Sequence, residues 1–187
     1  MMLTFTPAAF ATHLQKIQKT IEDRSRANLN ILGAAVAEDA RQSIGTYQQA
    51  IGPYTAWTQL AASTLYNKAK SGLGKNGNPD TPLYATGAMA ASIEYKVPNA
   101  QQAHVGSDDE TLIWMEEGTT KMPPRPVLGP AALRTVPKFT GMFGRSIAAV
   151  IAGADGRANV YVNSTYVSAH TRSSGTRVSG HWRKKSR

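Results

Sequence analysis

Three residues in the middle of this sequence have the types and the spacing of a metal-dependent nuclease. Asp80 follows a proline, thirteen residues separate it from Glu94, and Lys96 comes two positions later, which gives the pattern PD, thirteen residues, ExK. In such a site two carboxylates hold a divalent ion and the lysine orients the attacking water. One hypothesis is therefore a metal-dependent nuclease that uses Asp80, Glu94 and Lys96.

The same three residues also have a purely structural interpretation. Asp80 lies in the glycine-rich segment 71–82, SGLGKNGNPDTP, whereas a nuclease needs this carboxylate on a rigid strand. Glu94 and Lys96 lie two positions apart in the alternating segment 92–97, which is the usual pattern of the solvated face of a half-buried strand. We favour this interpretation and expect a protein that is not an enzyme and has no cofactor and no catalytic metal.

A second stretch that could carry chemistry is MEEGTTKMPPRP, residues 115–126. Its paired carboxylates suggest an active site, but its three prolines restrict the backbone to extended conformations and make a stiff segment that loses little entropy on docking. Arg125 can offer a planar fork to carboxylates or carbonyls of a neighbouring subunit. We predict an interface arm, and the alternative is an ordinary connector between a strand and a helix. The predicted interface residues are Glu116, Glu117, Gly118, Thr119, Pro123, Pro124, Arg125 and Pro126.

Other signatures of enzymes are missing from the sequence. The chain has no cysteine, so it has no disulfide, no zinc-thiolate site and no cysteine nucleophile. Its histidines share no metal-ligand spacing, and it contains no GxSxG motif, Walker loop or dinucleotide fingerprint. The N-terminal residues lack the pattern of a signal peptide, and the longest apolar run, 147–152, is too short to cross a membrane. We expect a soluble protein with no membrane partner.

The positive charge is concentrated near the C-terminus. Residues 153–187 contain seven basic residues and one acidic residue, and so carry six of the nine net positive charges. Such a segment, with little to bury, predicts disorder in isolation and contacts with acidic protein or with DNA. A DNA-binding packaging accessory is a further hypothesis, and it rests on this charge alone. The predicted tail contacts are Arg172, Arg177, Trp182, Arg183, Lys184, Lys185 and Arg187.

The N-terminal 45 residues have a helical pattern. Thr6 and Pro7 form a helix start. An apolar stripe with helical spacing covers 10–21 and resumes over 29–44, where Gly45 is a plausible end, and the segment 22–30 between them is polar and weakly helical. The pattern predicts two helices or one helix about 55 Å long. An unbroken helix of that length would exceed what this domain can cover and would need a partner subunit.

The rest of the chain predicts an α+β domain. We expect antiparallel strands at 92–97, 103–106 and 111–116, a helix from Gly129 that Pro137 kinks or splits, and one more strand at 159–163. This gives N-terminal helices and a small sheet of about three to four strands packed by a C-terminal helix, with residues 1–152 as the domain and 153–187 as a basic tail. The predicted buried residues are Trp57, Leu60, Ile93, Leu133, Phe139 and Ile147.

Several short motifs occur in a fixed order over about residues 50–135. They are Trp57-Thr58-Gln59-Leu60, Thr64-Leu65 with Lys68, Pro82-Leu83, Thr86-Gly87, Ser92-Ile93, Val105-Gly106, Glu117-Gly118-Thr119, Arg125-Pro126 and Pro130-Ala131. In this order the motifs resemble the tail-component family of tailed bacteriophages, which includes minor tail, tail-completion and head–tail joining proteins.

The resemblance implies a structural virion protein. It would form a homo-oligomeric ring, which we expect to be a hexamer, at the head-proximal end of the tail. Its partners would be the tail tube or terminator and the neck or connector proteins, with DNA in the channel as a further contact of the basic tail. Such a protein assembles in the host cytoplasm and ends in the virion.

Overall fold

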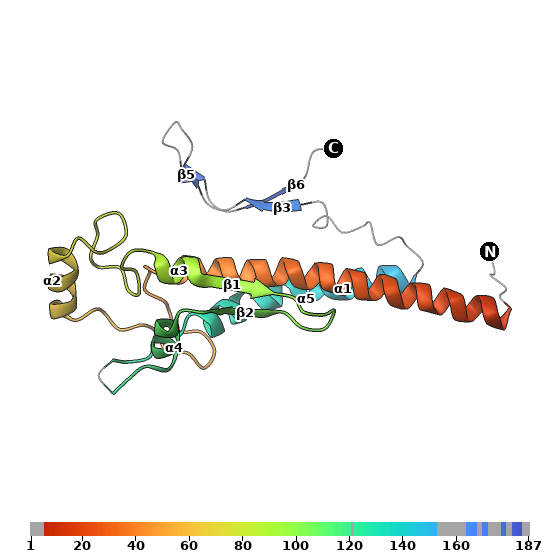
Figure 1. Ribbon diagram of the computed structural model, residues 1–187, viewed down its shortest axis with the longest axis horizontal. Coiled ribbons are helices and arrows are strands. Elements are labelled where there is room, and N and C mark those ends of the chain that lie inside the picture. Colours follow the sequence, from red (N-terminus) through yellow and green to blue (C-terminus); the bar gives the residue numbers. More distant parts are fainter. Residues whose placement is uncertain are drawn as a thin grey trace. The chain divides into compact units, whose positions relative to one another are not determined.

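A computed structural model describes residues 6–120 and 122–152, and the backbone of 164–167, 170–171, 177–178 and 181–184 (Figure 1). Its contacts divide the chain into two compact units, Asn28–Gly141 and a second formed by Met1–Ala27 with Met142–Arg187. The elements are α1 Pro7–Ser43, α2 Ala62–Lys70, α3 Ala88–Ser92, β1 Ile93–Lys96, β2 His104–Ser107, α4 Glu110–Glu117, α5 Leu128–Ile151, β3 Ser164–Val167, β4 His170–Thr171, β5 Arg177–Val178 and β6 His181–Lys184.

The N-terminal pattern forms one continuous helix, α1, of 37 residues. The predicted start is confirmed, because the hydroxyl of Thr6 accepts a hydrogen bond of 3.3 Å from the backbone N–H of Ala9. The predicted end is confirmed at Gly45, whose φ of +90° is the left-handed conformation that favours glycine and whose N–H donates to the carbonyl of Pro82. Of the two alternatives, the single long helix is therefore the one that forms.

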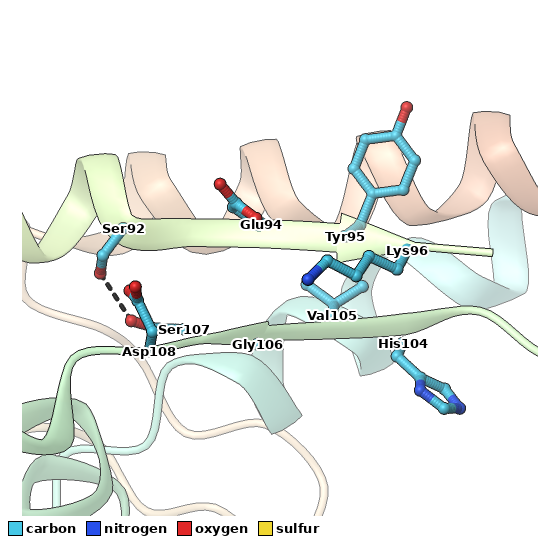
Figure 2. A pocket seen from close by; sticks show the side chains of 9 residues that line it. All are labelled: Ser92, Glu94, Tyr95, Lys96, His104, Val105, Gly106, Ser107 and Asp108. Carbon is cyan, nitrogen blue, oxygen red and sulfur yellow. Dashed lines mark hydrogen bonds between the residues drawn. The ribbon is translucent and has the colours of Figure 1, made fainter. Parts of the chain in front are cut away.

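The strands β1 and β2 form the predicted antiparallel hairpin. Ile93 pairs with Ser107 and Lys96 pairs with His104. At the Ile93 end the hydroxyls of Ser92 and Ser107 share a hydrogen bond of 2.6 Å (Figure 2). This sheet has only these two strands in the described part of the chain, so the expected sheet of three to four strands is not what the structure shows there.

The third predicted strand, at 111–116, is wrong, because these residues belong to helix α4. Asp109 caps this helix: its carboxylate accepts hydrogen bonds from the backbone N–H of Thr111 at 2.9 Å and from the hydroxyl of the same residue. The Thr111 side chain first, and then its backbone N–H, lower the pKa of Asp109 below its ordinary value. Asp109 and Glu110 therefore belong to a helix start.

The hairpin packs against the second half of α1. Tyr95 of β1 lies directly over Gly33, where an added methyl group would come within 2.8 Å of the tyrosine ring. Arg41 of α1 donates a hydrogen bond to the backbone carbonyl of Ile93. Figure 1 shows β1 running alongside α1. Glu94 and Lys96 are exposed, as the alternation in 92–97 predicts, whereas the contact of Tyr95 with α1 was not predicted.

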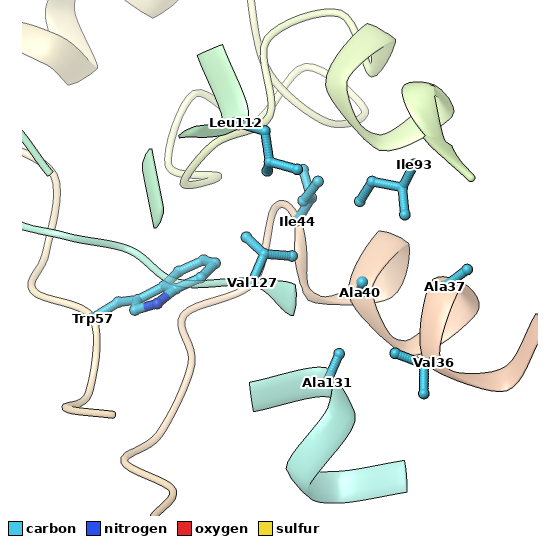
Figure 3. Packing of buried hydrophobic residues seen from close by; sticks show 9 residues of the cluster. All are labelled: Val36, Ala37, Ala40, Ile44, Trp57, Ile93, Leu112, Val127 and Ala131. Carbon is cyan, nitrogen blue, oxygen red and sulfur yellow. The ribbon is translucent and has the colours of Figure 1, made fainter. Parts of the chain in front are cut away.

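The core gathers where α1, the hairpin, α4 and the start of α5 meet (Figure 3). Its buried members are Val36, Ala37, Ala40, Ile44, Trp57, Ile93, Leu112, Val127 and Ala131. The predictions for Trp57 and Ile93 are confirmed, whereas Leu60, Phe139 and Ile147 are partly buried. The prediction that Leu133 is buried is wrong, because 41% of this residue is exposed. The buried side of α5 begins with Ala131 and Thr135, which leaves Leu133 on another side of the helix.

Helix α5 runs through Pro137 without ending, so the proline does not split it.

The sequence analysis does not predict the helices α2 and α3. They lie in or next to the region from Thr46 to Thr86, where the sequence has no clear hydrophobic period. None of the helices in the described residues is both long and apolar enough to cross a membrane.

Beyond α5 the described residues form short antiparallel pairs. Strand β3 pairs with β6 and β4 pairs with β5. This pairing was not foreseen from a composition that predicted disorder. The strand predicted at 159–163 lies outside the described residues.

Candidate functional site

The predicted interface arm is a small hairpin that leaves the C-terminal end of α4. The backbone N–H of Thr119 donates to the carbonyl of Met122 at 2.9 Å, and the N–H of Met122 donates back at 3.1 Å. Gly118 makes the turn out of the helix with a φ of +75°, and a methyl group there would lie 2.8 Å from the nitrogen of Pro124. The exposed residues among those described in this hairpin are Glu117, Thr119, Thr120, Pro123 and Pro124.

Arg125 is not at the tip of the arm, which corrects the expectation of an exposed fork. Only 6% of the residue is exposed. Its backbone N–H donates to the carbonyl of Met115 at 2.6 Å, and its Nη2 donates to the carbonyl of Thr58 at 3.1 Å. Its Nε is buried without a hydrogen-bond partner. Pro126 is also buried, so the arm ends at Pro124 and the next residues anchor it.

Glu116 has a structural role within the subunit. Its Oε1 accepts hydrogen bonds from the backbone N–H groups of Val127 at 2.8 Å and Leu128 at 2.7 Å. A carboxylate at this place satisfies unpaired donors at the start of α5 and complements the positive end of the helix dipole. Glu117 is exposed and remains available to a neighbour.

This difference between two adjacent glutamates gives a direct test. We expect Glu116→Ala to lower the free energy of unfolding by about 1.5–3 kcal/mol, because two buried N–H donors lose a charged acceptor. Glu117→Ala, the matched control, should change it by about 0.5 kcal/mol or less. Urea denaturation followed by circular dichroism measures both, and equal effects would contradict the capping role of Glu116.

A groove of about 470 Å³ lies beside the base of the arm. Met89, Met115 and Met122 line it together with apolar residues from the loops on either side of α2. Methionine side chains are flexible and polarizable, and they are common on surfaces that receive another protein. The full lining is Thr58, Gln59, Leu60, Ala61, Thr64, Lys68, Leu83, Tyr84, Ala85, Met89, Met115, Met122, Pro123 and Arg125.

Two cations belong to the lining of this groove. Arg125 is the buried one described above, and Lys68 donates from its Nζ to the carbonyl of Thr81 at 2.6 Å and to its hydroxyl at 3.3 Å. Burial lowers the pKa of Lys68, and the negative charge of Asp80 acts in the opposite direction. The sequence motifs pointed to Leu60, Thr64, Lys68 and Leu83 separately, but no local pattern indicated that the methionines would join them.

Asp80, the first residue of the nuclease pattern, holds a loop in place. Its Oδ1 accepts a hydrogen bond of 2.5 Å from the hydroxyl of Tyr47, and this hydroxyl in turn accepts from the backbone N–H of Leu60 at 3.0 Å. Burial raises the pKa of Tyr47, and the hydrogen bond to Asp80 raises it further. The carboxylate therefore connects the segment after α1 to the loop before α3.

Glu94 and Lys96 are exposed on β1 and line a shallow pocket of about 330 Å³ with His104 and Asp108 (Figure 2). Asp80 is not among the residues of this pocket. Within the described ranges no three histidine, aspartate or glutamate side chains come together as a possible metal site. The structure thus places Glu94 and Lys96 at one pocket and assigns Asp80 a different set of contacts.

Helix α4 exposes an apolar face that the sequence reasoning missed. Ile113 is 57% exposed and Trp114 is 54% exposed. Glu110 and Glu117, also exposed, lie at the helical spacing that puts all four residues on one side. The short apolar run at 111–116 predicts a strand, whereas the helical spacing of these four residues would have indicated this face.

The predicted tail contacts lie partly within the described backbone. Arg177 is in β5, and Trp182, Arg183 and Lys184 are in β6. Arg172, Lys185 and Arg187 lie outside the described residues.

No family model, no curated protein and no solved structure matches the chain.

Proposed function

We propose that this chain is a structural protein of a tailed phage, a tail-completion or neck protein. It forms a closed homo-oligomeric ring, a hexamer, at the head-proximal end of the tail and joins the tail to the head. The order of motifs from Trp57 to Ala131, similar to that of the tail-component family, supports the assignment to a tail. The structure contributes surfaces that suit assembly.

The observation that carries the proposal is the partly exposed apolar stripe on the first half of α1. Phe10 and Leu14 are each 49% exposed, although they belong to a regular stripe that continues through Ile17 and Ile21. Most of the stability of a helix in a protein comes from packing of its apolar face, and contiguous exposed apolar surface marks interaction sites. A helix of 37 residues that leaves about half of Phe10 and Leu14 exposed is suited to packing against other copies in a ring.

The arm supports the same conclusion. Its backbone is fixed by Gly118, by the reciprocal hydrogen bonds between Thr119 and Met122, and by the prolines that follow. A segment that is already ordered loses little conformational entropy when it docks on a neighbour. The arm thus adds a second preformed surface for contacts between subunits or with the tail tube.

Inactivation of the gene in the phage genome that carries it tests this function. We expect heads filled with DNA and separate tails, with few joined particles, in electron micrographs of the lysate. Supplying the wild-type chain from a plasmid should restore joined particles. Normal particles without the chain would overturn the proposal, and loss of DNA replication before any head appears would favour the nuclease instead.

The proposal also predicts that the purified chain does not cleave DNA. Glu94 and Lys96 then serve as the exposed side of β1, and Asp80 fixes a loop through Tyr47. We expect no cleavage of supercoiled plasmid with magnesium or manganese, and the same result for Glu94→Ala. Metal-dependent cleavage by the wild type that disappears in Glu94→Ala would contradict this reading.

A further inference from the structure

The exposed face of α4 has the composition of a docking surface. Ile113 and Trp114 occupy its centre, and Glu110 and Glu117 flank them. Tryptophan is among the residues that dominate the energy of protein interfaces, especially when an apolar neighbour adjoins it. Leu112, on the opposite side of the helix, is only 3% exposed and anchors α4 in the core, so the exposed face is held on a rigid support.

The methionine-lined groove has a composition complementary to the apolar and acidic face of α4. Its volume of about 470 Å³ lies within the range of about 300–1,000 Å³ that is common for binding pockets. Most of the residues that line it are apolar, and its polar members include the two cations Lys68 and Arg125. It therefore suits an apolar segment that brings negative charge.

Among the described residues, the two cations form no ion pair within hydrogen-bonding distance of a carboxylate. No ion pair in the described part of the chain involves Lys68 or Arg125. Asp80 attracts Lys68 through space, but its carboxylate oxygen is engaged by the hydroxyl of Tyr47. Arg125 is the buried one of the two, and a low local dielectric strengthens the attraction between such a cation and an incoming carboxylate.

We propose that α4 of one copy docks through Ile113 and Trp114 in the methionine-lined groove of the next copy, with Glu110 and Glu117 facing Lys68 and Arg125. This inference rests on the proposed ring and identifies a contact that builds it. The donor face and the groove are different surfaces of the same subunit, so the contact is head-to-tail and propagates from copy to copy. Charge complementarity selects a second copy as the occupant, since each subunit presents both partners of the contact.

Site-directed cross-linking tests the contact, because the chain has no cysteine of its own. One variant carries Ile113→Cys on the donor face and the other carries Thr64→Cys at the exposed edge of the groove. We expect a short bismaleimide to give a covalent dimer when the two are mixed. Adding Trp114→Ala to the donor variant should reduce the yield about tenfold or more. Thr140→Cys, exposed on α5, replaces Thr64→Cys as the control and should give no such product.

Two assembly-defective variants provide an independent readout. Trp114→Ala removes the donor surface and leaves the groove, whereas Thr64→Glu places a negative charge at the groove and leaves the donor surface. Each alone should assemble less than the wild type by mass photometry, and their mixture should form more dimer than either variant alone. A mixture that stays monomeric, or a Trp114→Ala protein that assembles as the wild type does, would overturn the proposed contact.

The outcomes separate this contact from the ring itself. Rings in micrographs without the cross-link would refute the α4 contact and leave the proposed function standing. Cross-linked open chains without rings would support the contact and refute closure. A wild-type chain that neither cross-links nor assembles at any concentration would overturn both.

Discussion

Arg125→Glu is expected to destabilise the folded monomer by about 3–5 kcal/mol, the range observed when a buried site is left with an uncompensated charge. The side chain lies in a site that is only 6% exposed. There its Nη2 donates to the carbonyl of Thr58 at 3.1 Å. A glutamate carboxylate in its place cannot donate, and it would repel the carbonyl oxygen of Thr58. Since domains are stable by only about 5–15 kcal/mol, much of the stability would be lost.

Urea denaturation followed by circular dichroism measures the effect of Arg125→Glu. Thr120→Glu at the exposed tip of the hairpin is the matched control, because it introduces the same charge without burial, and it should leave the midpoint unchanged. Arg125→Lys keeps the positive charge but loses the planar guanidinium group, so we expect its urea midpoint to lie between those of the wild type and Arg125→Glu. If Arg125→Glu unfolds at the wild-type midpoint, Arg125 is not the buried anchor described above.

The second large effect is expected for Leu112→Ala. Leu112 is 3% exposed and belongs to the core cluster, so its truncation leaves a cavity and should cost about 2–5 kcal/mol. Leu133→Ala makes the same chemical change at a residue that is 41% exposed. It should cost about 1 kcal/mol or less, because little apolar surface is uncovered. The sequence alone predicts burial for Leu133 and so would lead to the opposite ranking.

This pair of variants separates burial from residue type, since both remove the same atoms. Thermal and urea unfolding of the two proteins should rank Leu112→Ala far below Leu133→Ala. Equal losses would mean that the exposed side of α5 is covered by another part of the chain. The yield of assembled particles should also be compared between Leu133→Ala and the wild type, because an exposed leucine is suited to a contact between subunits.

Long periodic segments could be predicted from the sequence because their signals are local. The apolar stripes at 10–21 and 29–44 indicated helix but left open whether it is continuous, and the alternation in 92–97 indicated that Glu94 and Lys96 are exposed. The Thr6 cap and the Gly45 end also depend only on neighbouring residues. These features are determined by interactions within a few positions along the chain.

The misread features depend on distant contacts or on competing local signals. The segment 111–116 satisfies both a strand pattern and a helical pattern, and the Asp109 cap decides in favour of the helix. The burial of Arg125 depends on Thr58, and the role of Glu116 depends on where α5 begins. The groove likewise forms from side chains contributed by several separate segments, which no single sequence window can show.

Cryo-electron microscopy of intact tailed particles tests directly whether this chain forms the ring between tail and head. We expect a closed ring of identical subunits at the head-proximal end of the tail, each with one continuous helix of 37 residues. Copies of that helix should pack through the stripe that contains Phe10 and Leu14. A particle in which this position is occupied by a different protein, or in which the chain is absent from the tail and neck, would contradict the account.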